Sequence, residues 1–345
     1  MSSVNKIQEL NYKGKPVYVY ELTHSSGAKA VISNYGCILM KLQVQDKTGS
    51  FRDVVLGFDT IESYWEPSYL KSYPYFGAII GRYSNRIKKA SFFLNEKQIN
   101  VSTNQGENCL HGGYEGFDKK VWDVIEIRNE KDPCISFKYY SADAEEGFPG
   151  NLTTTFTIKL GANFLEYTIE ANTDADTAVN LTYHPYFNLD PASASINTQK
   201  AIIHANNWLE QDEDFCTTGK LIPTVNSEYD FLKWKTIIQE WNKTDGYDQS
   251  FVANKSTEEM DLVAEALSSD ANLHLQVIST EPIVHFYTGK WIPEISGKNN
   301  IVYGAYSGFC FETQHHPNAV NVPSFPNTIF TPNQTYKQTT IYQFI

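Results

Sequence analysis

The chain has 345 residues, of which 40 are acidic and 28 are basic, so its formal net charge is −12. This balance disfavours nucleic acids and anionic membrane surfaces as partners, because both require a basic face on the protein. Aromatic residues make up 14% of the chain, which favours β-structure and also offers flat walls of the kind that sugar sites use.

The N-terminal segment and the cysteines bear on the cellular compartment. Residues 1–15 contain no apolar stretch typical of a secretion signal, and no run approaches the 18 apolar residues of a membrane span. The five cysteines are scattered and form no C-x-x-C pair of the kind that binds zinc or exchanges disulfides. This pattern predicts reduced thiols and a cytoplasmic location.

Strict alternation of apolar and polar residues predicts half-buried β-strands along the chain. The alternation is clearest over residues 135–139, 155–160, 165–171 and 273–277. Turn-forming clusters lie at 46–49, 104–107, 147–150 and 217–220. Two further segments, 231–242 and 258–267, have a helical pattern that predicts a few turns each. Many short strands with no repeat and no linker predict a single all-β domain over residues 1–345, a sandwich or a barrel.

The common cofactor and metal motifs are absent from the sequence. Gly77 and Gly81 lack both the third glycine of a dinucleotide fingerprint and the Lys-Ser/Thr of a phosphate loop. The chain has no G-x-S-x-G and no H-E-x-x-H. His315 and His316 are neighbours, and neighbours on a strand point to opposite faces, so without a bulge they do not share one ion. We therefore expect no cofactor and no metal.

Five polar clusters interrupt otherwise apolar surroundings. They are residues 81–87 (GRYSNRI), 108–113 (NCLHGG), 180–189 (NLTYHPYFNL), 246–251 (GYDQSF) and 308–317 (GFCFETQHHP). In the last cluster, Glu312 is the one acidic residue and would share a strand face with Cys310 and Gln314. A carboxylate in such a strand must be paired, hydrogen-bonded or functional, because burying a bare charge is costly.

Each polar residue in these clusters also has an ordinary structural explanation. Glu312 could cap loop amides or pair with an arginine, and Arg86 could pair with a surface acid. His184 stands among aromatic residues, where a core or loop histidine is common, and His111 could bond to local backbone. Asp248 could form an Asx-turn. No single cluster decides between structure and function.

Taken together, the five clusters resemble the aldose 1-epimerase (galactose mutarotase) family in their order and separations, from about residue 10 to the C-terminus. The linking segments 53–58 (DVVLGF), 145–150 (EEGFPG), 286–289 (FYTG) and 323–326 (PSFP) add to the resemblance. It implies a large antiparallel β-sandwich, the galactose mutarotase-like supersandwich, with a sugar cleft on a concave sheet and with 258–267 as strand. The implied reaction interconverts the α and β anomers of free aldohexoses such as galactose and glucose, without metal or cofactor.

Carried over position by position, the resemblance also implies roles for individual residues. Glu312 matches the general base that takes the proton of the C1 hydroxyl, and His184 matches the general acid that protonates the ring oxygen. His111 matches a histidine that approaches the ring oxygen and C1. Sugar binding is assigned by the same matching to Asn85, Arg86, Tyr186 and Asp248. Arg82 lies in the first motif but is not expected to bind the sugar.

Two positions depart from the family pattern. His285 stands where many relatives carry glutamine, and Tyr183 stands where asparagine is common. His285 would share its strand face with Tyr287 and could hydrogen-bond a sugar hydroxyl with a pH dependence of its own, so it joins the candidate binding residues. Either change could alter the sugar preference without touching the acid/base pair.

Three functions remain open within this fold. An active aldose 1-epimerase, as a monomer or a homodimer, is the function that the resemblance favours. A hexose-6-phosphate 1-epimerase would need additional basic residues for the phosphate, and the net charge of −12 disfavours it. A non-catalytic sugar-binding protein would be expected to lack Glu312 or His184, and both are present.

Overall fold

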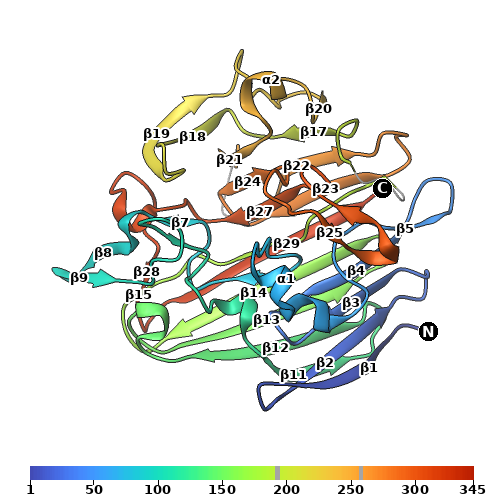
Figure 1. Cartoon of the computed structure of the whole chain (residues 1–345), viewed down its shortest axis with the longest axis horizontal. Helices are drawn as coiled ribbons and strands as arrows, with labels where there is room; N and C mark the ends of the chain where they lie inside the picture. Colours follow the sequence, from blue (N-terminus) through green and yellow to red (C-terminus); the bar gives the residue numbers. More distant parts are fainter. Residues whose placement is uncertain (191–194, 256–258) are drawn as a thin grey trace.

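Antiparallel β-strands form most of the regular structure in the computed structural model, which describes residues 1–190, 195–255 and 259–345 (Figure 1). The largest sheet has nine strands in the order β11-β12-β13-β14-β29-β23-β22-β17-β20. In chain order these are β11 (Asp123–Arg128), β12 (Cys134–Ser141), β13 (Leu152–Leu160), β14 (Phe164–Thr173), β17 (Lys200–Ile203), β20 (Lys235–Thr236), β22 (Asp261–Leu267), β23 (His274–Ser279) and β29 (Thr335–Phe344).

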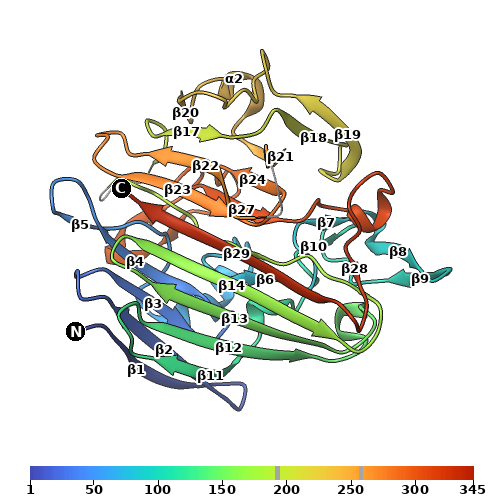
Figure 2. The same ribbon diagram turned by 180° about the vertical axis from the view of Figure 1, so that it is seen from behind.

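Two five-stranded sheets pack against this large sheet, whose long strands cross the view in Figure 2. The N-terminal one has the order β1-β2-β3-β4-β5, with β1 (Ser3–Tyr12), β2 (Lys15–Thr23), β3 (Lys29–Ser33), β4 (Leu39–Gln45) and β5 (Phe51–Asp53). The second has the order β19-β18-β21-β24-β27, with β18 (Asn207–Gln211), β19 (Thr217–Pro223), β21 (Asp248–Val252), β24 (Ile283–Tyr287) and β27 (Cys310–Gln314). The predicted all-β sandwich is thus confirmed.

The remaining elements are short connections between the sheets. The two-stranded pairs are β6 (Ile79–Ile80) with β16 (Thr182–Tyr183), β7 (Arg86–Ile87) with β10 (Cys109–Leu110), β8 (Ser91–Leu94) with β9 (Lys97–Asn100), β15 (Thr177–Ala178) with β28 (Ile329–Phe330), and β25 (Ile295–Ser296) with β26 (Val302–Tyr303). The helices are α1 (Pro67–Leu70) and α2 (Trp241–Thr244), with 3-10 turns η1 (Ile61–Trp65), η2 (Lys88–Ala90), η3 (Phe117–Lys119), η4 (Glu145–Gly147), η5 (Lys298–Asn300) and η6 (Ala319–Asn321). Among the described residues, no helix has the length and apolar character to cross a membrane.

Alternation along the strands builds the contact between the layers. On β13, Phe156 and Ile158 are fully buried while the residues between them stay partly exposed. They share one hydrophobic cluster with Phe286 of β24 and Phe311 of β27. Full burial of a large apolar side chain contributes about 1.5–3 kcal/mol, so this contact fixes β24 and β27 on the large sheet.

The opposite face of β21, β24 and β27 is polar as a consequence of the same alternation. Phe311 and Phe286 point towards the large sheet, so their neighbours Glu312 and His285 point away from it. In the register of these strands, Glu312 is paired with His285, and His285 with Ser250. A row of polar side chains therefore crosses three adjacent strands on the outer face.

The strands predicted from alternation at 135–139, 155–160, 165–171 and 273–277 are confirmed within β12, β13, β14 and β23. The helix predicted over 231–242 is wrong, because residues 235–236 pair with β17 at the edge of the large sheet and only α2 is helical. The predicted turn at 217–220 is also wrong: these residues belong to β19, and the turn lies at 212–216.

The helix predicted over 258–267 is wrong as well, and the strand implied by the family resemblance is present as β22. Residue 258 itself lies outside the described residues. A register shift between Leu262 and Ala264 leaves the consecutive residues Val263 and Ala264 both buried. This bulge breaks the strict alternation and imitates a helical pattern. The prediction of one domain over residues 1–345 stays a prediction.

Arg82 anchors the segment that leads to β7. Its guanidinium donates to the backbone oxygens of Pro149 and Gly150 at 3.0 and 2.8 Å, and to those of Ser141 and Ala142 at 3.0 and 2.8 Å. The Nε atom donates to the hydroxyl of Ser141 at 2.9 Å. Burial lowers the pKa of Arg82 to about 10, which leaves it charged at neutral pH. Its role is structural, in line with the expectation that it does not bind sugar.

We predict that Arg82→Met lowers the free energy of unfolding by about 3 kcal/mol or more, because several buried acceptors lose their donor. Urea denaturation measures this change. Arg128→Met is the control: the Arg128 side chain is 44% exposed, and a change there should stay within about 0.5 kcal/mol. Equal effects of the two substitutions would contradict the anchoring role.

Candidate active site

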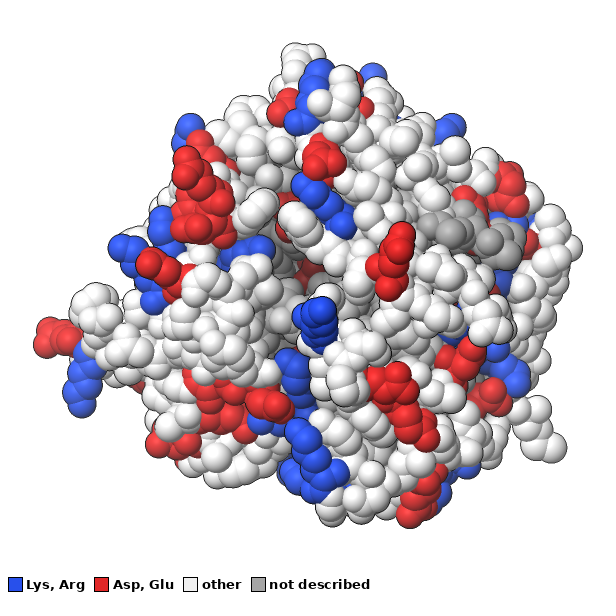
Figure 3. Space-filling model, in the orientation of Figure 1, with Lys and Arg blue, Asp and Glu red and all other residues white. Residues whose placement is uncertain are grey.

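A cavity of about 290 Å³ lies on the polar face of β21, β24 and β27. The space-filling view shows the molecule hollowed near the middle of this face, with acidic side chains at the bottom of the hollow (Figure 3). All residues proposed from the sequence line this cavity: Asn85, Arg86, His111, His184, Tyr186, Asp248, His285 and Glu312. The structure therefore brings together side chains from six separate segments of the chain, while their individual roles stay predictions.

Close backbone packing brings the His111 segment to the cavity. The His111 backbone N–H donates to the carbonyl of Asn85 at 2.9 Å, and β7 pairs with β10 just before it. Gly112 follows with a φ of +85°, and a Cβ there would lie 2.0 Å from the carbonyl oxygen of Gly81. Only glycine allows this approach. A glycine directly after His111 is thus required for the loop to reach the cavity wall.

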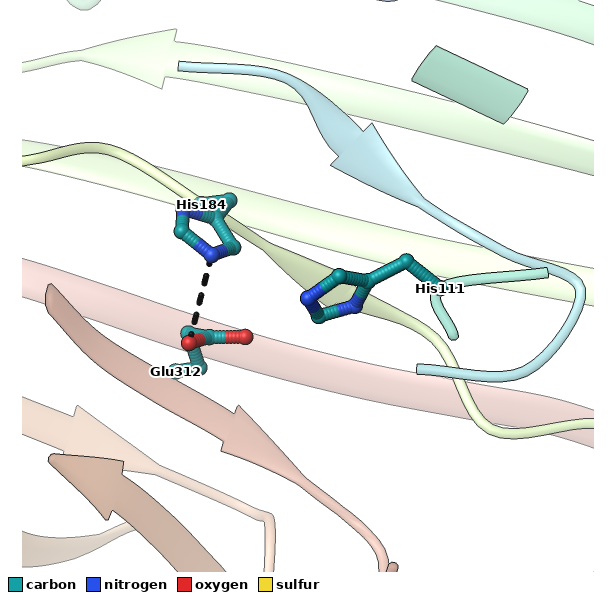
Figure 4. A group of neighbouring side chains, drawn as sticks. All are labelled: His111, His184 and Glu312. Carbon is teal, nitrogen blue, oxygen red and sulfur yellow. Dashed lines mark ion pairs between the residues drawn. The ribbon is translucent and has the colours of Figure 1, made fainter. Parts of the chain in front are cut away.

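His184 and Glu312 form a buried pair at the bottom of the cavity. The Nε2 atom of His184 lies 3.4 Å from Oε1 of Glu312, and the two side chains are only 3% and 2% exposed. The second oxygen, Oε2, is buried and has no protein hydrogen-bond partner. Figure 4 shows the two side chains pointing at each other from different segments, with His111 beside them. A carboxylate oxygen without a partner at this depth is available to a ligand.

The other nitrogen of the His184 ring faces a thiol. The Sγ atom of Cys310 lies 3.5 Å from Nδ1 of His184. Burial, and then the nearby charge of Glu312, raise the pKa of the Cys310 thiol well above its ordinary value. The sulfur therefore contacts the imidazole as a neutral group and brings no second negative charge to the pair.

His111 is neutral, and its tautomer follows from its hydrogen bond. Burial, with the charges of His184 and Arg86 as smaller contributions, lowers the pKa of His111 well below its ordinary value. The Nδ1 atom accepts the backbone N–H of Asn85 at 3.2 Å. The ring hydrogen of the neutral imidazole is therefore on Nε2, which makes this atom a donor.

His111, His184 and Glu312 also have the spacing of a metal site, since one ligand atom from each lies within 4.8 Å of the others. A ligating histidine binds through a bare nitrogen and usually donates its other N–H to a neighbour. His111 instead accepts a hydrogen bond on Nδ1, so its Nε2 carries hydrogen. The cluster therefore fits a metal poorly and fits a hydrogen-bonding ligand well.

Asp248 is held by His285 on the adjacent strand. The Nε2 atom of His285 lies 2.8 Å from Oδ1 of Asp248. Burial alone would raise the pKa of Asp248, but the hydrogen bond from His285 and the positive charge of Arg86 outweigh it and hold the pKa below its ordinary value. Asp248 is thus an ionised acceptor on the cavity wall and not a simple Asx-turn.

Arg86 is the one basic residue, histidines aside, among the described residues that line the cavity. Its Nε atom donates to Oε1 of Gln105 at 2.7 Å, and its guanidinium lies 5.2 Å from the centre of the Phe215 ring. Among the described residues it forms no ion pair with a carboxylate. The alternative of a surface ion pair therefore does not hold, and the guanidinium N–H groups can face a ligand.

Aromatic side chains complete the wall. The Tyr186 ring packs 5.0 Å from that of His184. Five further aromatic residues of the lining were not predicted from the sequence: Tyr73, Tyr75, Phe215, Tyr287 and Trp291. Alternation along the strand places Tyr287 on the same face as His285 and could have identified it. Phe215 and Trp291 lie in loops, where no periodic pattern indicates which side chains reach the cavity. Tyr183 lies in the core, where its hydroxyl donates to the carbonyl of Cys37 at 3.0 Å, and it does not line the cavity.

Comparisons with known proteins agree with this geometry. Residues 18–343 match the family model described as aldose 1-epimerase. A human galactose mutarotase is 36% identical over 100% of this chain and 99% of its own length, and an Escherichia coli aldose 1-epimerase is 30% identical over 99% of both. The crystal structure of an aldose epimerase homologue from C. elegans has a TM-score of 0.85 at 29% identity, covering 94% of this chain and 98% of its own. A galactose 1-epimerase from Lactobacillus acidophilus has a TM-score of 0.86 at 23% identity, covering 100% and 99%.

The neutral state of His111 predicts a pH dependence of stability. Burial also lowers the pKa of His316, to about 4. Unfolded histidines bind a proton below about pH 6.5, whereas these two do not when folded, so stability is complete above that pH and falls as the pH decreases. Each group contributes a slope of at most about 1.4 kcal/mol per pH unit.

We expect His111→Asn to reduce the slope of unfolding free energy against pH by the contribution of one proton between about pH 6.5 and pH 5. Urea denaturation at several pH values measures this slope. His316→Asn should do the same, and above about pH 7.5 all three curves should be parallel. A slope unchanged by both substitutions would show that neither histidine is neutral in the folded protein.

Proposed function

The chain belongs to the aldose 1-epimerase family, and we propose that it acts on free aldohexoses such as galactose and glucose with Glu312 as base and His184 as acid. The observation that supports these roles is the buried pair at the bottom of the cavity, with one carboxylate oxygen left unpartnered. A second carboxylate–imidazole pair, Asp248 with His285, also lines this cavity, but the other ring nitrogen of His285 is in hydrogen-bond contact with Ser250. The mechanism requires an ionised Glu312 and a protonated His184.

Ring opening follows from this arrangement. The Oε2 atom of Glu312 takes the proton of the C1 hydroxyl while Nε2 of His184 gives its proton to the ring oxygen. The bond between C1 and the ring oxygen breaks, and C1 becomes the carbonyl carbon of the open aldehyde. A positioned acid or base of this kind typically contributes about 10²–10⁴-fold to the rate.

Ring closure uses the same two groups in reverse. Rotation about the C1–C2 bond presents the other face of the carbonyl. The C5 hydroxyl attacks C1 and returns its proton to His184, while the carbonyl oxygen takes the proton back from Glu312. Both side chains end in their starting states, so the cycle consumes no co-reactant and needs no cofactor.

The remaining side chains bind the sugar without exchanging protons. Neutral His111 donates from Nε2 beside the reacting pair, and this hydrogen bond stabilises charge on the ring oxygen or O1. Arg86 donates and Asp248 accepts, so together they bind hydroxyl groups of fixed orientation. The faces of Tyr186 and Tyr75 give the apolar side of the sugar a surface to contact.

The charge of the cavity favours a neutral sugar over the alternative of a hexose 6-phosphate. Arg86 faces two carboxylates, Asp248 and Glu312, across the same cavity. A phosphate with close to two negative charges would meet these carboxylates with one guanidinium to offset them. The non-catalytic alternative is disfavoured by the presence of both members of the acid/base pair.

We also propose a cytoplasmic location, because all five cysteines are free and buried. The expectation of a monomer or a homodimer stays a prediction.

Polarimetry on freshly dissolved α-D-galactose or α-D-glucose tests the activity and the acid/base pair. The purified protein should speed the approach to equilibrium, and Glu312→Gln or His184→Asn should each lower kcat by about 10²–10⁴-fold. Thermal melts should show that both variants are folded.

The matched controls are Glu210→Gln and His204→Gln, which remove a carboxylate and an imidazole outside the cavity. Both should retain the wild-type rate. Variants of Glu312 and His184 that stay near wild type would contradict their assignment, and an inactive wild-type protein would favour a sugar-binding role.

A second prediction separates the two sugar classes. With glucose and glucose 6-phosphate under identical conditions, kcat/KM should be at least about tenfold higher for glucose, because the phosphate enters a cavity with a surplus of carboxylates. A preference for the phosphate ester would contradict the proposal that the charge of the cavity favours a neutral sugar.

A further inference from the structure

Both ring nitrogens of His285 are already engaged by the protein. Asp248 is ionised and cannot donate, so the 2.8 Å contact requires a hydrogen on Nε2 of His285. When the ring is neutral, Nδ1 has a lone pair that can accept a hydrogen bond from the hydroxyl of Ser250, which lies 2.9 Å away. Ser250 is fully buried and His285 is 3% exposed. A chain of hydrogen bonds therefore runs from Ser250 through His285 to Asp248.

Asn85 completes the surroundings of this ring. Its Oδ1 atom accepts the backbone N–H of Arg86 at 2.8 Å, which turns its Nδ2 group towards His285. The distance from Nδ2 of Asn85 to Nδ1 of His285 is 3.5 Å. Two proposed binding residues, Asp248 and Asn85, thus both contact one imidazole.

Asp248 has a second oxygen that remains for the sugar. Among the described residues, no hydrogen bond occupies Oδ2 of Asp248, and the side chain is 23% exposed to the cavity side. His285 has no such free polar atom. Asp248 is therefore suited to contact a sugar hydroxyl, and His285 is suited to act through Asp248.

We propose that His285 is a positioning residue for sugar recognition, which fixes Asp248 and Asn85 and makes sugar affinity depend on pH. This rests on the proposed function of the cavity. It differs from the expectation that His285 contacts the sugar itself.

The direction of the pH effect follows from the hydrogen-bond chain. A proton on Nδ1 places a donor opposite the Asn85 amide, which also donates, and forces the Ser250 hydroxyl to turn. The positive ring also draws charge from the Asp248 carboxylate and weakens it as an acceptor for the sugar. The charged and titratable groups around the ring are Asp248, Arg86, His111, His184 and Glu312; the two carboxylates attract the added charge and Arg86 repels it. KM should therefore rise as the pH falls.

The experiment compares KM and kcat for galactose between pH 5.5 and pH 8 in the wild type, His285→Gln and His285→Ala. Glutamine keeps an N–H near Nε2 but does not titrate, so KM should stay within about threefold of wild type at pH 8 and become independent of pH. Alanine should raise KM about tenfold or more, because a hydrogen bond to a charged group is lost, with kcat changed less than about threefold.

His204→Gln is the matched control, because His204 is also bonded to a carboxylate, Glu265 at 2.9 Å, but lies outside the cavity. Its KM profile should equal that of the wild type. The same pH series of galactose affinities, measured by calorimetry on Glu312→Gln, tests the inference without turnover and separates it from the catalytic assignment.

Three results would overturn the inference. These are a wild-type KM that does not change with pH, a His285→Gln profile that still follows the wild type, and a His285→Ala variant that loses kcat while KM is unchanged. The last would make His285 part of the chemical step. If the Glu312 and His184 variants are fully active, the proposed function is contradicted, whatever the His285 variants show.

Discussion

The site depends on the alternation of side chains across three registered strands, β21, β24 and β27. One face of these strands is aromatic and packs on the large sheet. The polar side chains, which the core excludes, therefore lie on the other face. Glu312 is fixed there between Cys310 and Gln314, with no freedom to reach solvent. The cost of burying this carboxylate is offset by His184, and its unpartnered oxygen is available to a ligand.

Differences in surroundings and hydrogen bonding separate the three histidines of the cavity. His111 is neutral because it is buried near other cations, and the Asn85 N–H fixes its tautomer as a donor. His184 faces a carboxylate and a neutral thiol, which suits a ring that passes a proton back and forth. Both ring nitrogens of His285 are in hydrogen-bond contact with protein side chains. In the proposed mechanism the same type of side chain thus serves hydrogen-bond donation, proton transfer and positioning, according to its neighbours.

The sequence predicted the parts of the fold in which local pattern and tertiary contact agree. The strands over 155–160 and 165–171 alternate without interruption, and so the layer contact was foreseeable. The helical prediction at 258–267 failed because a bulge buries Val263 and Ala264 together. The helical prediction at 231–242 failed because pairing at the sheet edge overrode a local helical preference. The site residues came from the family resemblance, and the loop aromatics Phe215 and Trp291 were missed because nothing local marks a residue that reaches the cavity only through the fold.

In the proposed mechanism Glu312 and His184 act as one unit, in which each proton transfer requires the other. The most direct measurement is kcat for the double variant Glu312→Gln/His184→Asn beside the two single variants. If the pair acts as a unit, the double variant should have a kcat close to that of the slower single variant. A double variant in which the two losses multiply would show that the residues act independently and would contradict the account.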